Sequence, residues 1–136
     1  MLTAQTGLVN YIADSTVDFK TVEAYSGQMK DAIKLTGKLP AAFPMFKKVV
    51  KPLGIKNHLF DILICTKSDS FDKKTSQNTN LQHASALLDY IEANLTFTES
   101  TKDFIIDRDQ NPPEARLLMQ DNKFTIVVIT VHVITE

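Results

Sequence analysis

Few residues in this sequence could do chemistry by themselves. The three histidines include no pair at the i, i+4 spacing that places two imidazoles on one metal ion. The single cysteine, Cys65, would be a nucleophile only beside a basic partner, and its apolar neighbours favour a buried, inert thiol. His132 lies in an apolar segment, where a structural role is favoured over metal binding. The sequence lacks the glycine-rich, nucleophile-elbow and zinc motifs, so we predict no enzyme activity, cofactor or metal site.

Charge is distributed unevenly along the chain. Residues 30–56 hold seven lysines and one acid, whereas residues 89–121 hold eight acids and three bases. Two solvated faces are the simpler interpretation. The alternative is a head-to-tail interface, in which the basic region of one copy meets the acidic region of the next, and such contacts close into rings when the rotation permits. The candidate interface residues are Lys47, Lys48, Lys51, Phe71, Asp107 and Asp109.

The acidic and the basic residues among these candidates each have a second interpretation. Asp107 and Asp109 flank an arginine as a D-x-D pair, but without a third acid at fixed spacing a solvated loop is favoured over a cation site. Lys47, Lys48 and Lys51 could contact a phosphate backbone, since each lysine adds salt-dependent attraction. The net charge of −1 argues against a general nucleic-acid binder.

The composition is that of one globular domain spanning residues 1–136. Hydrophobic residues make up 43% and charged residues 23% of the chain, which fits a folded rather than a disordered protein. The first residues lack the basic and apolar regions of a secretory signal, and no stretch reaches the roughly twenty apolar residues of a membrane span. We therefore expect folding in a reducing cytoplasm.

The segment from Phe124 to Thr135 is the most apolar part of the chain. In an extended strand its alternate side chains form two faces, and both are apolar. Such a strand belongs in the middle of a sheet that is covered on both sides. Because the predicted helices suffice for only one side, we expect a neighbouring subunit to supply the missing cover.

The remaining elements follow from periodicity and turn residues. We predict helices over Leu2–Asp14, Gln28–Leu35 (capped by Ser26) and Leu81–Leu95 (capped by Thr79 or Asn80), with a polar loop over Lys67–Asn80. Strands are predicted at Phe19–Tyr25, Leu39–Val50, Asn57–Thr66, around Phe104–Ile106, at Ala115–Gln120 and at Phe124–Thr135. The two prolines of the second strand place it at a sheet edge or a bulge. The fold class is α+β: a single mixed, mostly antiparallel sheet of four to five strands with helices packed on one face.

Two short motifs stand at definite places in this order of elements. In VEAYSGQ (residues 22–28) a strand enters a Tyr-x-Gly-Gln turn and a short helix. LPAAF (residues 39–43) comes next, followed by the apolar strand Leu59–Cys65, a polar loop, the helix His83–Leu95 and a final apolar strand. In these motifs and their order the chain resembles the tail terminator proteins of Mu-like phages and prophages.

The resemblance implies a hexameric ring that caps the finished tail tube, stops its growth and offers a docking surface to the head or neck. The implied partners are other copies of the chain, the tail tube protein, head and neck connectors and the sheath protein, with DNA passing only through the lumen. The implied location is the virion tail, assembled in the bacterial cytoplasm. Two alternatives stay open: a head–tail adaptor or other neck protein, and an enzyme or ligand-binding domain built from scattered residues such as Asp61, Cys65 and His132.

Overall fold

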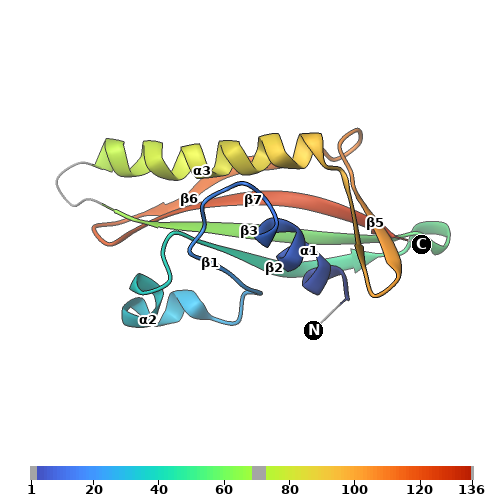
Figure 1. Ribbon diagram of the computed structural model, residues 1–136, viewed down its shortest axis with the longest axis horizontal. Helices are drawn as coiled ribbons and strands as arrows, with labels where there is room; N and C mark the ends of the chain where they lie inside the picture. Colours follow the sequence, from blue (N-terminus) through green and yellow to red (C-terminus); the bar gives the residue numbers. More distant parts are fainter. Residues whose placement is uncertain (1–2, 69–72, 136) are drawn as a thin grey trace.

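The computed structural model describes residues 3–68 and 73–135, which form one curled sheet with helices against it (Figure 1). The α-helices are α1 (Thr3–Ala13), α2 (Ala32–Thr36) and α3 (Lys73–Ala93), and the 3₁₀ turns are η1 (Gln28–Lys30) and η2 (Pro52–Gly54). The strands are β1 (Thr21–Val22), β2 (Ala41–Val50), β3 (Lys56–Lys67), β4 (Thr96–Glu99), β5 (Lys102–Ile106), β6 (Glu114–Gln120) and β7 (Phe124–Thr135).

The sheet of the described chain has seven strands in the order β1-β2-β3-β7-β5-β4, with β6 paired to β7. β1 runs parallel to β2, and the other pairs are antiparallel, so the α+β class and the mixed, mostly antiparallel sheet are confirmed. The prediction of four to five strands is wrong. The sequence pattern missed β4, because its four residues are too short to show an alternation, and β4 pairs with β5 as a small hairpin.

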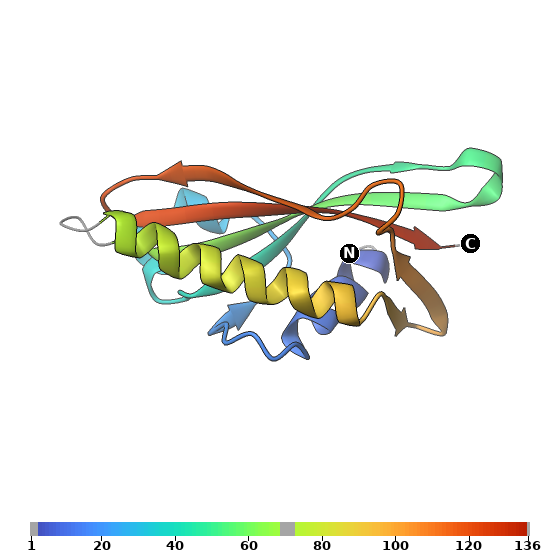
Figure 2. The ribbon, with the colours of Figure 1, turned by 90° about the horizontal axis from the view of Figure 1, so that it is seen from above.

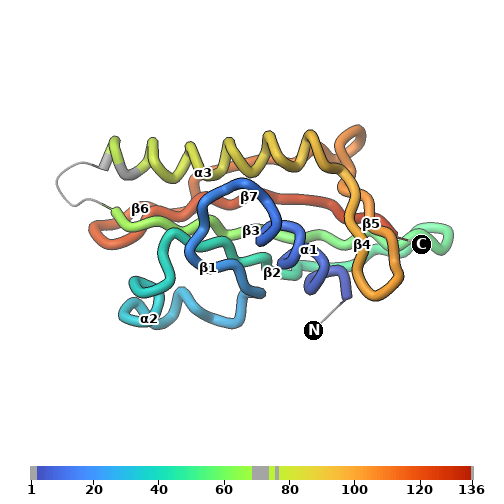
Figure 3. The backbone as a smooth tube through the Cα atoms, in the orientation of Figure 1, coloured from blue at the N-terminus to red at the C-terminus, as the bar shows by residue number. Residues whose placement is uncertain are grey.

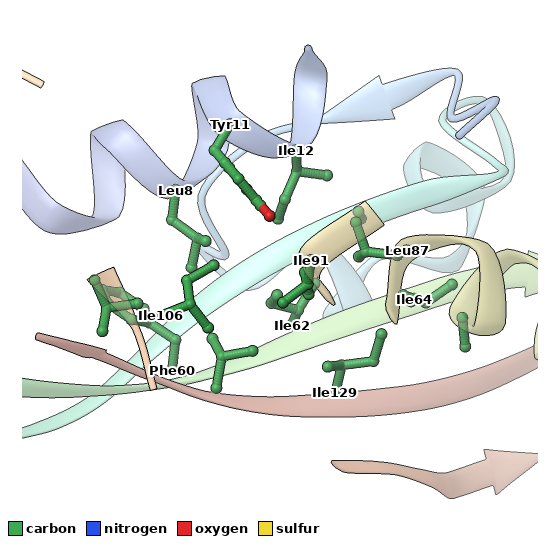
Figure 4. Packing of buried hydrophobic residues seen from close by; sticks show 14 of the residues in the cluster. Leu8, Tyr11, Ile12, Phe60, Ile62, Ile64, Leu87, Ile91, Ile106 and Ile129 are labelled. Carbon is green, nitrogen blue, oxygen red and sulfur yellow. The ribbon is translucent and has the colours of Figure 1, made fainter. Parts of the chain in front are cut away.

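β7 is the central strand, as its two apolar faces predicted. β3 pairs with one edge along its whole length, while β5 and β6 divide the other edge between them. On one face of the sheet, α1 and α3 cover the alternate side chains of β3 and β7 (Figure 4). Leu8 and Ile12 from α1 and Leu87 and Ile91 from α3 lie in this cluster, each at most 1% exposed.

The other face of β7 has a second apolar cluster, which the chain supplies from its own residues. Leu35 of α2 packs with Phe43, Leu63 and Val128, and Met29 from η1 lies against them. The helices therefore occupy both faces of the sheet, and the prediction of helices on one face is wrong. The expectation that another subunit must cover Phe124–Val128 is also wrong, because the segment between β1 and β2 folds over it (Figure 1).

The second face is only partly covered toward the carboxyl end of β7. Thr130, His132 and Ile134 are half-buried, whereas Phe124, Ile126 and Val128 on the same face are buried. Ile105 of β5, which pairs with Ile134, is 53% exposed. Apolar side chains at this end of the second face therefore still meet solvent.

α3 begins much earlier than its apolar pattern predicted. Lys73–Asn80 is helical rather than a loop, so neither Thr79 nor Asn80 caps the helix. Asn80 lies inside α3 and is 0% exposed. Its Nδ2 donates to Ile64 O (3.1 Å), Thr66 Oγ1 (3.0 Å) and Thr125 O (2.7 Å), so a polar residue at a core position ties the helix to β3 and β7.

The predicted short helix is broken in two. Asp31 adopts an extended conformation between η1 and α2, and its Oδ1 accepts a hydrogen bond from Lys34 N at 3.2 Å, so Asp31 is the cap of α2. Ser26 is not a cap, since its backbone N–H instead donates to Gln28 Oε1. Ile33 is 87% exposed, and the extended conformation of Asp31 separates α2 from η1, so the two segments do not share the faces of one continuous helix.

Proline and glycine mark two places where the chain departs from regular structure. β2 has a bulge between Phe46 and Lys48, and beyond the two-residue β1 its outer edge carries no further strand, which confirms the edge or bulge predicted from the prolines. Gly7 in α1 lies against β4, where a Cβ would sit 2.7 Å from the Phe97 ring and 2.9 Å from Glu99 Cβ. Glycine therefore allows the close approach of helix and strand.

Candidate interaction surfaces

The hairpin of β2 and β3 projects beyond the rest of the sheet at one end of the molecule (Figure 2). We call residues 47–57 the projecting hairpin; η2 forms its tip. In this segment β2 pairs only with β3 among the described strands, whereas Lys56 and Asn57 of β3 also pair with β7, so the exposed side chains are those of residues 47–55. The consequence is an exposed surface made of lysines and aliphatic residues.

The three predicted interface lysines lie on this hairpin but have different surroundings. Lys47 sits at the bulge, and its Nζ is 3.9 Å from Oδ2 of Asp61. The other oxygen of this carboxylate, Oδ1, accepts a hydrogen bond from Thr130 Oγ1 at 2.8 Å. Lys48 and Lys51 are exposed. The structure thus brings the three lysines to one element, with Lys47 partly engaged in the sheet and the other two directed to solvent.

Apolar side chains accompany these lysines. Val49 and Val50 are 48% and 49% exposed, and Leu53 at the tip is fully exposed. Leu53 has φ 52° and ψ 35°, a left-handed conformation that leucine rarely adopts, and Gly54 follows with φ 86°. Val49 and Val50 are successive strand residues and point to opposite faces, so the largest apolar side chain that the hairpin offers to a partner is Leu53 at its tip.

The predicted acidic residues lie in the segment between β5 and β6. Asp107 shapes this segment: its Oδ1 accepts from the backbone N–H groups of Asp109 (3.1 Å) and Gln110 (3.2 Å), and its Oδ2 from Asn111 Nδ2 (3.1 Å). Partial burial raises the pKa of Asp107, but the hydrogen bonds from Asn111, Gln110 and Asp109 outweigh it and hold that pKa below its ordinary value. Asp109 is exposed, and its Oδ1 lies 3.9 Å from Arg108 Nε.

A groove lies between the carboxyl-terminal half of α3 and the segment after β5, which pass close to each other in Figure 3. Its volume is about 380 Å³. Leu88, Leu95 and two prolines give it an apolar floor, and Asp89, Glu92 and Arg108 line it as well; the full set is Ser85, Leu88, Asp89, Ile91, Glu92, Leu95, Arg108, Pro112 and Pro113. The sequence analysis missed this groove, since nothing in the pattern of either segment indicated that they meet.

β6 is a further exposed element that the sequence analysis did not single out. Among the described strands it pairs with β7 alone, so no second strand lies along its other edge. Leu117, Leu118 and Met119 are 45%, 49% and 37% exposed. An exposed apolar edge strand is a template for pairing with another chain, and the three consecutive apolar residues were the available sequence signal.

The scattered residues that could have formed a catalytic or ligand site have separate structural partners. His132 Nδ1 lies 3.3 Å from Asn57 Oδ1, while Asp61 contacts Thr130 and a lysine. Cys65 is fully buried, and burial raises the pKa of its thiol to about 12. Over residues 3–68 and 73–135, no three His, Cys, Asp or Glu side chains group so as to hold a metal ion.

His58 is buried without a hydrogen-bond partner for either ring nitrogen in the described structure. Its ring packs 6.4 Å from Phe60 and 6.3 Å from Phe104, measured between ring centroids. Burial lowers the pKa of His58, and the charges of Lys56 and Lys102 lower it further. The neutral imidazole is therefore part of the core.

Phe71, the remaining predicted interface residue, lies outside the described residues. No helix of the described chain is both long enough and apolar enough to cross a membrane. Comparison of the sequence with protein-family models found no match, and comparison with curated proteins found none either.

Proposed function

We propose that this chain is a structural subunit of a phage tail, the terminator that forms a hexameric ring on the end of the tail tube. In this role it stops the polymerisation of the tube and offers a docking surface to the head or neck. It works without catalytic residues or a cofactor, within the virion tail. The proposal comes from the family resemblance of the sequence, and the surfaces of the fold support it.

The observation that supports the proposal best is that the chain has two different surfaces of opposite character. One is the projecting hairpin, with Lys48, Lys51 and exposed aliphatic side chains. The other is the groove beside α3 with its carboxylates, next to the acidic segment after β5. Contact between two different patches is heterologous, and heterologous contacts generate rings or filaments rather than isologous dimers. A ring subunit needs such a pair of surfaces.

A terminator must fit the last ring of the tube on one side and refuse more tube subunits on the other. This requires complementary shape and charge rather than a reactive group. The outer edge of β6, along which no other described strand lies, supports this role, because an added strand or a neighbouring subunit would cover it.

The test is to incubate the purified chain with tail tubes whose tube protein comes from the same gene cluster, and to image the tube ends. Terminated tubes should carry a sixfold cap and should stop elongating when tube protein is added. Tubes that elongate unchanged and carry no cap would overturn the proposal. A head–tail adaptor would instead bind the head vertex, and its gene would not lie just upstream of the sheath and tube genes.

A further inference from the structure

The tip of the projecting hairpin exposes a leucine that the fold itself does not use. Leu53 is fully exposed, in a left-handed conformation between Pro52 and Gly54. A leucine in this conformation is less favourable than glycine or asparagine, and its side chain gains nothing from burial within the chain. The side chain of Leu53 is therefore open to a contact with another molecule.

The groove beside α3 has the shape and chemistry to receive such a tip. Its volume of about 380 Å³ falls within the range of pockets that bind small ligands and side chains. Leu88, Leu95 and Pro112 are among its lining residues, so an inserted aliphatic side chain would exchange water for apolar contacts.

The charges around the tip and around the groove are complementary. Lys51 and Lys56 flank the tip, and neither forms a described ion pair. Asp89 and Glu92 line the groove, and within the described residues neither carboxylate has a cation within 4.0 Å. The one cation of the groove, Arg108, lies beside the exposed Asp109. Attraction between the lysines of one copy and the carboxylates of another would orient the tip toward the groove as the two copies meet.

We propose that Leu53, at the tip of one copy's hairpin, inserts into the groove between α3 and the segment 108–113 of a second copy of this chain. The contact is intermolecular, because Leu53 is fully exposed and no residue of the hairpin lines the groove of its own chain. This inference rests on the proposed function, since it names the contact that joins neighbouring subunits of the ring. Each copy donates one tip and receives one, which leaves no site unfilled in a closed ring.

Disulfide trapping tests this contact directly. The double variant Leu53→Cys/Ser85→Cys places one thiol on the tip and one in the groove, and Ser85→Cys is nearly isosteric. The matched control is Leu53→Cys/Ala86→Cys, because Ala86 is exposed on the same helix but does not line the groove. The natural Cys65 is buried with a raised pKa, so it adds little background.

On mild oxidation of the full chain, the Ser85→Cys pair should form intermolecular crosslinks about tenfold faster than the Ala86→Cys pair. The products should form a ladder that ends at a closed ring. Crosslinks that stop at a doubly linked dimer would support the tip-in-groove contact and overturn the ring. Equal rates for the two pairs, or no crosslinks in a concentrated sample, would overturn the contact between copies.

A charge exchange separates this contact from non-specific association. Lys51→Glu should slow crosslinking by the tip and groove cysteines, as should Glu92→Lys, and the two changes together should restore the rate. Lys51 and Glu92 are both exposed, so the melting temperatures of the variants should match that of the parent protein. If each single change leaves the rate unaltered, or if the double change does not recover it, the charge pairing is wrong. Leu53→Ser should weaken self-association by about tenfold to a hundredfold, as truncation of a buried anchor does.

Discussion

Asn80 offers the sharpest test of how the fold is held together. It is a polar residue at a fully buried position of α3, and its side-chain amide contacts acceptors on β3 and β7. We predict that Asn80→Ala destabilises the protein although alanine is the better helix former. The reason is that the amide joins the long helix to both central strands.

The magnitude follows from the contacts. The two N–H groups of Nδ2 serve Ile64 O, Thr66 Oγ1 and Thr125 O, and hydrogen bonds of this kind contribute about 1 kcal/mol each in net terms. Removal of the Asn80 side-chain amide also leaves each buried acceptor with one partner fewer and creates a small void. The higher helix propensity of alanine offsets about 0.5 kcal/mol of this loss. The net loss in the free energy of unfolding is about 2 kcal/mol, or about 5–10 °C in melting temperature for a chain of this size.

Urea and thermal unfolding of the variant measure this loss. The matched control is Asn78→Ala, which removes the same side chain from an exposed position of α3 and should be neutral or slightly stabilising. Equal stabilities of Asn80→Ala and Asn78→Ala would refute the reasoning.

A second substitution at the same position adds a pH signature. In Asn80→Asp a carboxylate would face three acceptor oxygens in the core, so the pKa of the new carboxyl would rise above its unfolded value. The stability of this variant should be highest at acid pH and should fall as pH rises through the raised pKa, relative to Asn80→Ala. The same pH profile for both variants would contradict the buried placement.

Three further predictions follow from the described residues. Gly7→Ala should lower the free energy of unfolding by about 1–3 kcal/mol, and the melting temperature with it, because the added Cβ overpacks against Phe97 although alanine has the better helix propensity. An unchanged or raised melting temperature would mean that β4 moves aside without cost. Cys65 should resist thiol reagents at pH 8 in the folded state and react on unfolding, and equally rapid labelling of the native chain would contradict its burial. Because burial lowers the pKa of His58, this histidine contributes stability above its unfolded pKa of about 6.5, and the contribution is lost as pH falls through the folded pKa. The variant His58→Phe should therefore show a flatter dependence of stability on pH between about pH 7 and 5. An unchanged pH dependence would contradict this prediction.

The sequence predicted the elements that have strong periodicity. The central strand β7, the β6–β7 hairpin and α1 all lie within two residues of their predicted bounds, because each shows its apolar pattern over its whole length. Asp121 closes the turn between these two strands, since its Oδ1 accepts from the backbone N–H groups of Lys123 and Phe124.

The errors arose where tertiary contacts override local pattern. Lys73–Asn80 is polar and was predicted as a loop, but Asn80 finds its partners on two strands and extends the helix. The second face of β7 was predicted to need another subunit, because the segment that covers it, residues 23–40, holds only the 3₁₀ turn η1, the five-residue helix α2 and irregular chain. Cover of this kind leaves no periodic trace in a sequence.

One candidate surface could be predicted from the sequence and the other could not. The clustering of Lys47, Lys48 and Lys51 could be predicted because they are close in sequence, and the hairpin presents them together. The groove could not, since residues 85–95 and 108–113 meet only after β4 and β5 have folded back beside α3. The sequence also gave equal weight to Lys47, which in the structure pairs with Asp61, so Lys48 and Lys51 are the better sites for charge reversal.

The most direct test of head-to-tail assembly is the mass and symmetry of the wild-type chain in solution, measured at rising concentration in low and high salt. We predict a closed assembly with six times the mass of one chain, which weakens at high salt because lysines and carboxylates meet at each contact. A chain that stays monomeric at every concentration and salt, or that forms only a twofold dimer, would contradict the account.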